Sequence, residues 1–180
     1  MSPPPEFSRT VRIDALPASG RPLSIGANEE ERAALAERFG LVAIERLSAE
    51  ALLKRSSEEI RAEGTLSAAV VQSCVATGAP VPAEVDEHFS IVFRPHPEAL
   101  GEEEEIELSE GELDVIFYDG AAVDVGEAVA ETLSLSLDPY PRSADAEEAL
   151  GKAGVKSEEE QRAESSPFAG LAALKDKLGK

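Results

Sequence analysis

The sequence predicts an α+β domain, built on an antiparallel sheet of about six strands with two packed helices. Three observations lead to this class: a long central hairpin at residues 64–94, two capped amphipathic helices, and the lack of any strand–helix–strand repeat. Such a sheet can curl toward a barrel. We expect one domain at residues 1–142, an acidic disordered linker at 143–165, and a C-terminal amphipathic helix at 166–180.

The two arms of the central hairpin share a two-residue apolar period, which is typical of half-buried strands. The period consists of Leu66, Ala68 and Val70 in the first arm and of Phe89, Ile91 and Phe93 in the second. Gly78, Pro80 and Pro82 lie between the arms, and these residue types favour a turn. Cys74 stands where the first arm meets this turn. Residues 59–63 can lengthen the first arm.

Shorter strands are expected on both sides of the hairpin. Residues 6–14 alternate apolar and polar side chains, and residues 21–26 can form a second short strand. Residues 41–47 are apolar and β-branched enough for a strand, which residues 49–55 either prolong or leave as a helical turn. Residues 113–119 form another short strand that ends at an Asp-Gly turn.

Two helices have clear start signals. Asn28 with Glu31 and Asp124 with Glu127 both have the spacing of a capping box, in which each side chain bonds a free N–H at the helix start. The first helix is expected at residues 29–39, before Gly40, and the second stops before the Asp-Pro at 138–139. The apolar stripe of the second comprises Val125, Ala128, Val129, Thr132, Leu133 and Leu135 or Ser136.

The negative charge of the chain is concentrated in its middle. The formal net charge is −19, and residues 64–150 hold 2 Lys and Arg against 20 Asp and Glu. A surface of this sign repels nucleic-acid phosphates, DNA included, and attracts basic partners. The simpler alternative is that these acids only keep the protein in solution. The four glutamates at 102–105 lack the acid-Gly-acid spacing of a calcium loop, so no metal is expected there.

Composition also limits the compartment. The start, MSPPPEFSRT, has neither the apolar run nor the basic cluster of a secretory signal, and no stretch reaches the roughly 20 apolar residues that span a bilayer. A single Cys excludes an internal disulfide. We therefore expect a cytoplasmic protein that makes no membrane contact and uses no cofactor.

The sequence offers one candidate for nucleophilic chemistry, which is Cys74 with His88 or His96 as its base. His88 lies on the opposing arm, so the two side chains could meet. Nothing orients the imidazole or supplies an oxyanion hole, and a strand cysteine is commonly a small buried hydrophobe. Tyr118 and Tyr140 are too few for an aromatic platform that binds single-stranded nucleic acid. We therefore expect no enzyme.

Three segments follow one another in a familiar order: CVATGAPVPAEVDEHFSIVFRP after a β arm, the helix in VDVGEAVAETLSLSLDPYPR, and the terminal SPFAGLAALKDKL. This arrangement resembles the YceD family of large ribosomal RNA subunit accumulation proteins, in the branch found in alphaproteobacteria. The resemblance covers roughly Glu59 to the C-terminus. Within that family many members carry Cys-x-x-Cys at the hairpin turn, and some carry further Cys or His near Pro141 and Arg142.

That family pattern suggests a staple like a zinc knuckle. Here Cys74 takes the first position, but Thr77 stands where the second Cys would be. We therefore predict no metal site in this chain. The turn is instead expected to be held by packing and by backbone hydrogen bonds.

The resemblance implies a non-enzymatic role in the synthesis, processing or stability of large-subunit ribosomal RNA. Because the surface is acidic, we expect action through a basic ribosomal protein or a ribosome-assembly factor, with only indirect association with the RNA. The expected partner-binding residues are Asp138, Tyr140 and Arg142 after the second helix, and Phe168, Leu171, Leu174 and Lys175 in the C-terminal helix.

Two alternatives remain open at this point. The first is direct RNA binding through the basic residues of the N-terminal third, Arg9, Arg12, Arg32, Arg38, Lys54 and Arg55. The second, weaker alternative is an enzyme that depends on Cys74.

Overall fold

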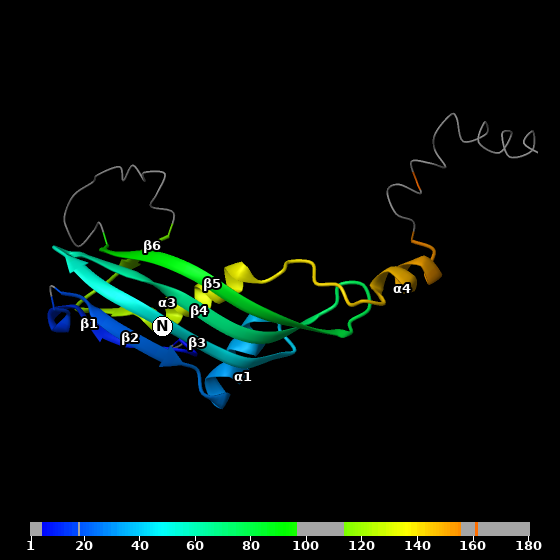
Figure 1. The fold of residues 1–180 in the computed structure, drawn as a ribbon, viewed down its shortest axis with the longest axis horizontal. Helices are drawn as coiled ribbons and strands as arrows, with labels where there is room; N and C mark the ends of the chain where they lie inside the picture. The colour runs from blue at the N-terminus through cyan, green and yellow to red at the C-terminus, as the bar shows by residue number, and fades with distance from the viewer. Residues whose placement is uncertain (1–4, 18, 97–113, 156–160, 162–180) are drawn as a thin grey trace, which may run out of the picture.

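The structure is a computed structural model, and it describes residues 5–17, 19–96, 114–155 and 161. A long twisted sheet forms one layer, and helices cover one of its faces (Figure 1). The α+β class is therefore confirmed. One hydrophobic core lies between the two layers, and its fully buried side chains include Phe7, Leu35, Leu53, Ile60, Leu66, Phe93 and Leu133.

The main sheet has five strands in the order β2-β3-β4-β5-β6. They are β2 (Arg21–Gly26), β3 (Ala43–Ser56), β4 (Glu59–Ser73), β5 (Pro80–Pro95) and β6 (Val115–Tyr118). The first four strands pair antiparallel, but β6 runs parallel to β5. The prediction of a purely antiparallel sheet is therefore wrong at β6. The predicted closure toward a barrel is also wrong, because β2 and β6 stay at opposite edges.

The parallel strand has a simple topological reason. A parallel pair needs a crossover of a dozen or more residues, whereas an antiparallel pair needs only a tight turn. β5 ends at Pro95 and β6 begins at Val115, so the chain between them is long enough. The sequence pattern favoured hairpins because it contains no helical crossover before Val115. The glutamates at 102–105 belong to this connection and lie outside the described residues.

The central hairpin is longer than predicted. Its arms reach from Glu59 to Pro95 rather than from 64 to 94. Pro80 and Pro82 were expected in the turn, but they begin β5. Proline is tolerated there because, within the described chain, only β4 pairs with this end of β5, so the missing N–H can face the open edge.

β3 decides between the two alternatives that the sequence left open for residues 49–55. The strand continues from Ala43 through residues 49–55, so the alternative of a helical turn there is wrong. Its partner β4 approaches it very closely at Gly64. A Cβ on Gly64 would collide with the carbonyl oxygen of Glu50, so a side chain at this position would push the two strands apart.

Helices α1 (Glu29–Phe39) and α3 (Val125–Ser136) pack on the same face of the sheet. α1 has the predicted bounds and the predicted capping box. Asn28 Oδ1 accepts the Glu31 N–H at 2.9 Å, and the Glu31 carboxylate accepts the Asn28 N–H at 2.8 Å. The chain leaves the helix at Gly40 in the left-handed conformation, with φ 67°.

α3 differs from its prediction in two details. Asp124 caps it by accepting the N–H groups of Gly126 and Glu127, at 3.0 and 3.3 Å. The expected capping box is incomplete, because the Glu127 carboxylate bonds Arg38 at 2.7 Å. Leu135 does not belong to the buried stripe, since it is 83% exposed. The buried stripe consists of Val125, Gly126, Ala128, Val129, Ala130 and Leu133.

The N-terminal segment crosses the start of α3. The predicted strand at 6–14 is confirmed only as β1 (Thr10–Arg12), which a short 3-10 turn, η1 (Ile13–Ala15), follows. β1 pairs antiparallel with β7 (Ala122–Asp124), in a small sheet of its own. This pairing covers the core at one end of α3, because Phe7 and Val11 are buried beneath it.

The chain forms another helix, α4 (Ala146–Lys152), where the disordered linker was predicted. The linker prediction is therefore wrong over these residues. Ala, Glu, Leu and Lys are good helix formers, and Lys152 pairs with Glu148 one turn before it at 2.6 Å. A helix this short contains too few apolar residues to show a period in the sequence. The predicted helix at 166–180 lies outside the described residues.

Candidate functional site

The turn of the central hairpin, residues 74–79, is held by its own hydrogen bonds; we call it the hairpin tip. The Cys74 N–H donates to the Ala79 carbonyl at 2.8 Å, and the Gly78 N–H donates to the Cys74 carbonyl at 2.9 Å. Gly78 has φ 72°, which favours glycine. Thr77 Oγ1 accepts the Ala79 N–H at 3.2 Å. Backbone bonds thus hold this turn, as the sequence led us to expect.

The connection between α3 and α4 is fastened to the hairpin tip. The Val75 N–H donates to the Pro141 carbonyl at 2.9 Å, and the Ser143 N–H donates to Cys74 Sγ at 3.3 Å. The hydroxyls of Thr77 and Ser143 lie 3.2 Å apart and share a hydrogen bond. These contacts join parts of the chain that are far apart in sequence, so they fix where the connection leaves the domain.

A buried glutamine extends the same attachment. Gln72, near the end of β4, is only 7% exposed, and its Nε2 donates to the Asp138 carbonyl at 2.8 Å. Nothing in the sequence pattern predicts this role, since a glutamine on a strand is usually a solvent-facing residue. The buried amide and the tip contacts together hold residues 138–143 along the end of the hairpin.

The hydrogen bonds at the tip change the acidity of Cys74. The Ser143 hydroxyl, the Thr77 hydroxyl and the Ser143 N–H stabilise the thiolate and lower the pKa of Cys74 to about 6. Cys74 is 3% exposed, and burial alone raises the pKa of a thiol. Here burial raises the pKa less than the hydrogen bonds lower it.

The residues that face Cys74 do not fit the zinc staple that the family resemblance suggested. Thr77 and Ser143 present neutral hydroxyls, whereas structural zinc sites use thiolate, imidazole or carboxylate ligands. In the described parts of the chain, no three Cys, His, Asp or Glu side chains lie close enough together to hold a metal ion. Hydrogen bonds therefore join the hairpin tip to the connection at the position where the zinc staple was suggested.

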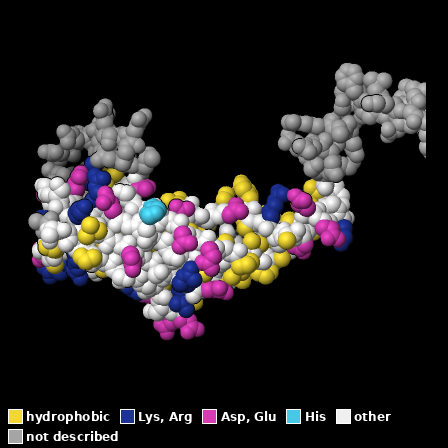
Figure 2. Space-filling view, viewed as in Figure 1, with side chains coloured by type: hydrophobic (Ala, Val, Ile, Leu, Met, Phe, Trp, Pro, Cys, Tyr) yellow, Lys and Arg dark blue, Asp and Glu magenta, His cyan; other side chains and the backbone are white. Residues whose placement is uncertain are grey.

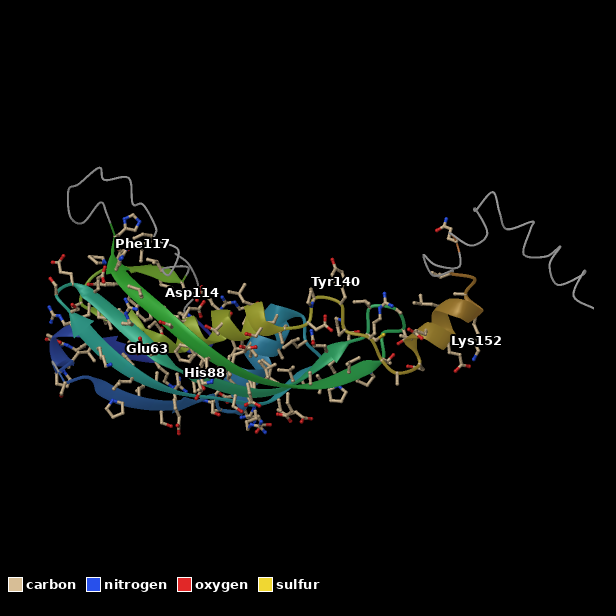
Figure 3. All side chains as sticks on the ribbon, turned by 45° about the horizontal axis from the view of Figure 1, so that its top comes forward. Glu63, His88, Asp114, Phe117, Tyr140 and Lys152 are labelled. Carbon is tan, nitrogen blue, oxygen red and sulfur yellow. The ribbon has the colours of Figure 1, made fainter. Side chains whose placement is uncertain are left out.

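The structure does not bring Cys74 and a histidine together. His88 lies on β5 opposite Thr65, whereas the residue before Cys74, Ser73, pairs with Pro80. Eight residues of strand separate Pro80 from His88, which corresponds to roughly 26 Å. Figure 3 shows His88 along the body of the sheet, away from the tip. His96 packs against Phe117, with ring centroids 5.8 Å apart.

Apolar side chains are exposed around the attachment. A groove of about 520 Å³, which we call the tip groove, opens between the end of α1, the end of β4 and the end of α3. Its apolar lining comprises Phe39, Leu41, Val75, Leu135, Leu137 and Pro139. Leu135 is 83% exposed and Val75 is 55% exposed. On the face drawn in Figure 2, hydrophobic side chains gather near the hairpin tip, between the body of the domain and α4.

Three of the predicted partner-binding residues lie beside this groove, on the connection. Tyr140 is 73% exposed and projects away from the sheet (Figure 3). Arg142 is exposed as well. Asp138 lines the groove, but its carboxylate also accepts the Tyr140 N–H at 2.9 Å and so shapes the turn. The other four predicted residues, Phe168, Leu171, Leu174 and Lys175, lie outside the described residues.

The basic residues of the N-terminal third are mostly engaged inside the domain. Arg9 binds both carboxylate oxygens of Glu31, at 2.7 and 2.8 Å. Arg38 binds Glu127 and Glu6, and the closest contact is 2.7 Å. The other pairings are Arg12 with Asp14, Arg32 with the Ala27 carbonyl, and Arg55 with the Ser57 carbonyl. A phosphate would have to compete with these partners.

Comparison with known proteins supplies the family. The model of the family described as large ribosomal RNA subunit accumulation protein YceD matches residues 62–175. The chain belongs to the YceD family. The matched range contains β5, the hairpin tip, α3 and the connection, so the candidate site lies within the YceD region. The family name associates such proteins with accumulation of large-subunit ribosomal RNA.

The chain was also compared with curated proteins and with solved structures. No curated protein and no solved structure matches the chain. Within the described residues, no helix is long and apolar enough to cross a membrane.

Proposed function

We propose that this protein is a non-enzymatic, cytoplasmic binding protein that supports the synthesis, processing or stability of large-subunit ribosomal RNA. It would act through a basic protein partner. Candidate partners are a basic ribosomal protein or a ribosome-assembly factor, which would connect it indirectly to the RNA. The family match supports the link to ribosomal RNA. The single observation that supports a protein partner is the exposed apolar surface of Tyr140, Leu135 and Val75.

The charge around this surface favours a cationic polypeptide. Asp138 lines the groove, and Asp145, Glu147 and Glu148 follow on the connection and on α4. Large aromatic and aliphatic side chains supply most of the binding energy of protein interfaces, and surrounding charges speed up the encounter. Acidic residues around an exposed Tyr and Leu therefore suit a basic, partly apolar protein better than a phosphate backbone.

Binding to purified basic ribosomal proteins tests the proposal. Tyr140→Ser is expected to weaken binding by about tenfold or more, the usual loss on truncating a central aromatic contact. Phe117→Ser is the matched control, because Phe117 is an exposed aromatic residue on β6, at the opposite end of the sheet (Figure 3). A chain that ends at residue 165 tests the contribution of Phe168, Leu171, Leu174 and Lys175. Equal binding by the Tyr140 variant and the wild type would refute the assigned surface.

Direct RNA binding is the second candidate function, and its support is the set of basic residues in the N-terminal third. A gel-shift with precursor ribosomal RNA at several salt concentrations separates the two candidates. If the protein contacts phosphates directly, its affinity for the RNA falls steeply with salt concentration. If it acts through a protein partner, it binds the RNA only weakly when that partner is absent. Retained function in a Cys74→Ser strain would dismiss the weaker idea of a cysteine-dependent enzyme.

A further inference from the structure

The tip groove is an apolar surface that the described part of the chain leaves uncovered. Leu135 stands on the last turn of α3, and it is 83% exposed although Leu133, two residues earlier on the same helix, is fully buried. Val75 faces the same groove from the hairpin tip and is 55% exposed. Apolar side chains that cluster around a concave surface mark an interaction site. The groove therefore needs an occupant.

The chain itself supplies an apolar segment shortly after α4. Residues 168–178 follow the last helix and contain Phe168, Leu171, Leu174 and Leu178 at spacings that put them on one side of a helix. Residues 156–167 lie between Val155 and this segment. Such a stretch spans at most roughly 40 Å when fully extended and has a mean reach of roughly 20 Å as a flexible chain.

The attachment of the connection holds the start of the path to the tail at the groove. Pro141 lines the groove and accepts the Val75 N–H, and α4 then leads the chain to Val155. Ser143 bonds Cys74, which prevents the connection from swinging away from the hairpin tip. Linking two binding segments through a short flexible chain gives an effective concentration of order millimolar, and at such a concentration even a weak intrinsic affinity suffices for docking.

Charge also favours this occupant. Lys175, Lys177 and Lys180 stand at the C-terminal end of the segment. The approach to the groove carries Asp138, and Asp145 follows on the connection. Both acidic side chains are exposed and outnumber the one exposed arginine between them, Arg142, so they can attract the lysines before the apolar side chains make contact.

We infer that residues 168–178 dock their apolar side in the tip groove of the same chain when no partner is bound. The inference concerns the same groove and tail as the proposed function, and it rests on that function in one respect. The same side chains, Phe168, Leu171 and Leu174, are assigned there to a partner, so a partner has to displace the docked tail. The docking itself needs no partner and is measured without one.

Hydrogen–deuterium exchange on the full-length protein tests the docking. A helix of this length is marginal in water when it is free, so its amides should exchange near the rate of an unfolded chain unless it is docked. In the wild type we expect clear protection of residues 168–178. The double variant Leu135→Gln and Val75→Ser should lose at least about tenfold of that protection, because it removes two apolar contacts. Phe117→Ser serves as control and should keep it.

The outcomes separate docking from its alternatives. Exchange of the wild-type tail at the free-chain rate would overturn the inference, and so would full protection in the double variant. Protection that rises with protein concentration would overturn it in favour of a tail docked on a second copy. Phe168→Glu should abolish protection while the exchange of β3 and β4 stays unchanged, which shows that the domain remains folded. Because no partner is present, failure here leaves the partner test untouched, and failure of the partner test leaves the exchange result standing.

Discussion

Other segments of the chain are attached at both ends of α3, and the two attachments use different kinds of contact. The N-terminal segment is attached at the start of the helix, and the hairpin is attached beyond its end. At the start of α3, the Arg9 N–H donates to Asp124 at 2.7 Å, and the Arg9 side chain holds Glu31 with two bonds. At the end of α3, neutral groups make the contacts, such as Gln72 to the Asp138 carbonyl. The first attachment uses charged groups and buries Phe7 completely.

The difference separates an end that closes the core from an end that leaves apolar side chains exposed, which is the end we propose for binding. The N-terminal segment closes the core, so a change there should act on the free energy of unfolding. The connection after α3 runs past the core and leaves Leu135 and Tyr140 exposed, so a change there should act on binding. Four substitutions test this division, in order of decreasing expected effect on stability.

The largest effect is expected for Gly126→Ala. A Cβ at Gly126 would collide with the carbonyl oxygen of Phe7 and lie 2.8 Å from the Arg9 nitrogen, so the N-terminal segment would have to lift. Forced overpacking of this kind costs about 3 kcal/mol of unfolding free energy, measurable by urea denaturation. Gly151→Ala in α4 is the matched control, because nothing lies within 4 Å of its Cβ position. Equal stability of the two variants would contradict the close approach.

Arg38→Met comes second. Arg38 joins α1 to Glu127 of α3 and to Glu6, and the three side chains are only 25% to 34% exposed. Its loss should lower the unfolding free energy by about 1 kcal/mol, since paired bonds in partly buried positions exceed ordinary surface pairs. Arg46→Met removes a more exposed pair with Glu84, so its effect should stay below about 0.5 kcal/mol. The reverse ranking in denaturation midpoints would argue against a stabilising role for Arg38.

Ser143→Ala comes third, and it should act through the pH dependence of the unfolding free energy. The wild-type pKa of Cys74 is lowered to about 6 from the ordinary 9.0, with the Ser143 hydroxyl as its first cause. Because the folded state binds fewer protons, its stability should rise between about pH 6 and pH 9 and lose this contribution as the pH falls through 6. The variant should raise the pKa of Cys74 and flatten that rise. Ultraviolet titration of the thiolate checks this, and an unchanged midpoint would contradict it.

Leu135→Gln is expected to have the smallest effect on stability. An exposed apolar residue on a helix contributes little to folding, and Gln is a good helix former, so the unfolding free energy should change by less than about 0.5 kcal/mol. Leu133→Gln is the contrasting variant on the same helix, because Leu133 is fully buried. Thermal denaturation of both variants is the measurement. A large loss in Leu135→Gln would mean that the tip groove contributes to the core.

Sequence patterns predicted the parts of this fold that depend on local order. The capping box at Asn28, the end of α1 at Gly40 and the alternation along β4 and β5 are all local, and all are present. The parallel strand β6 escaped prediction because its partner is determined by a long connection. α4 escaped because a helix of one or two turns shows no period.

The candidate site was predictable only in part. Tyr140 and Arg142 were predicted to bind a partner, and both are exposed in the structure. Leu135 was assigned to the buried stripe, because a leucine at nearly helical spacing reads as core until the end of the sheet beneath it is known. No sequence rule pairs Gln72 with Asp138 or Cys74 with Ser143, since these contacts join residues that lie more than 60 positions apart.

The pairing of Thr10 with Asp124 imposes an order of events during translation. Strands β3, β4 and β5 join neighbours in sequence, with Ser56 opposite Glu59 and Ser73 opposite Pro80, so this meander can form early on the nascent polypeptide. Arg9 must wait for a residue 115 positions later before its backbone finds a partner. Residues 7–12 therefore lock in place only after Asp124 has been made, although they precede all three strands of the meander in the chain.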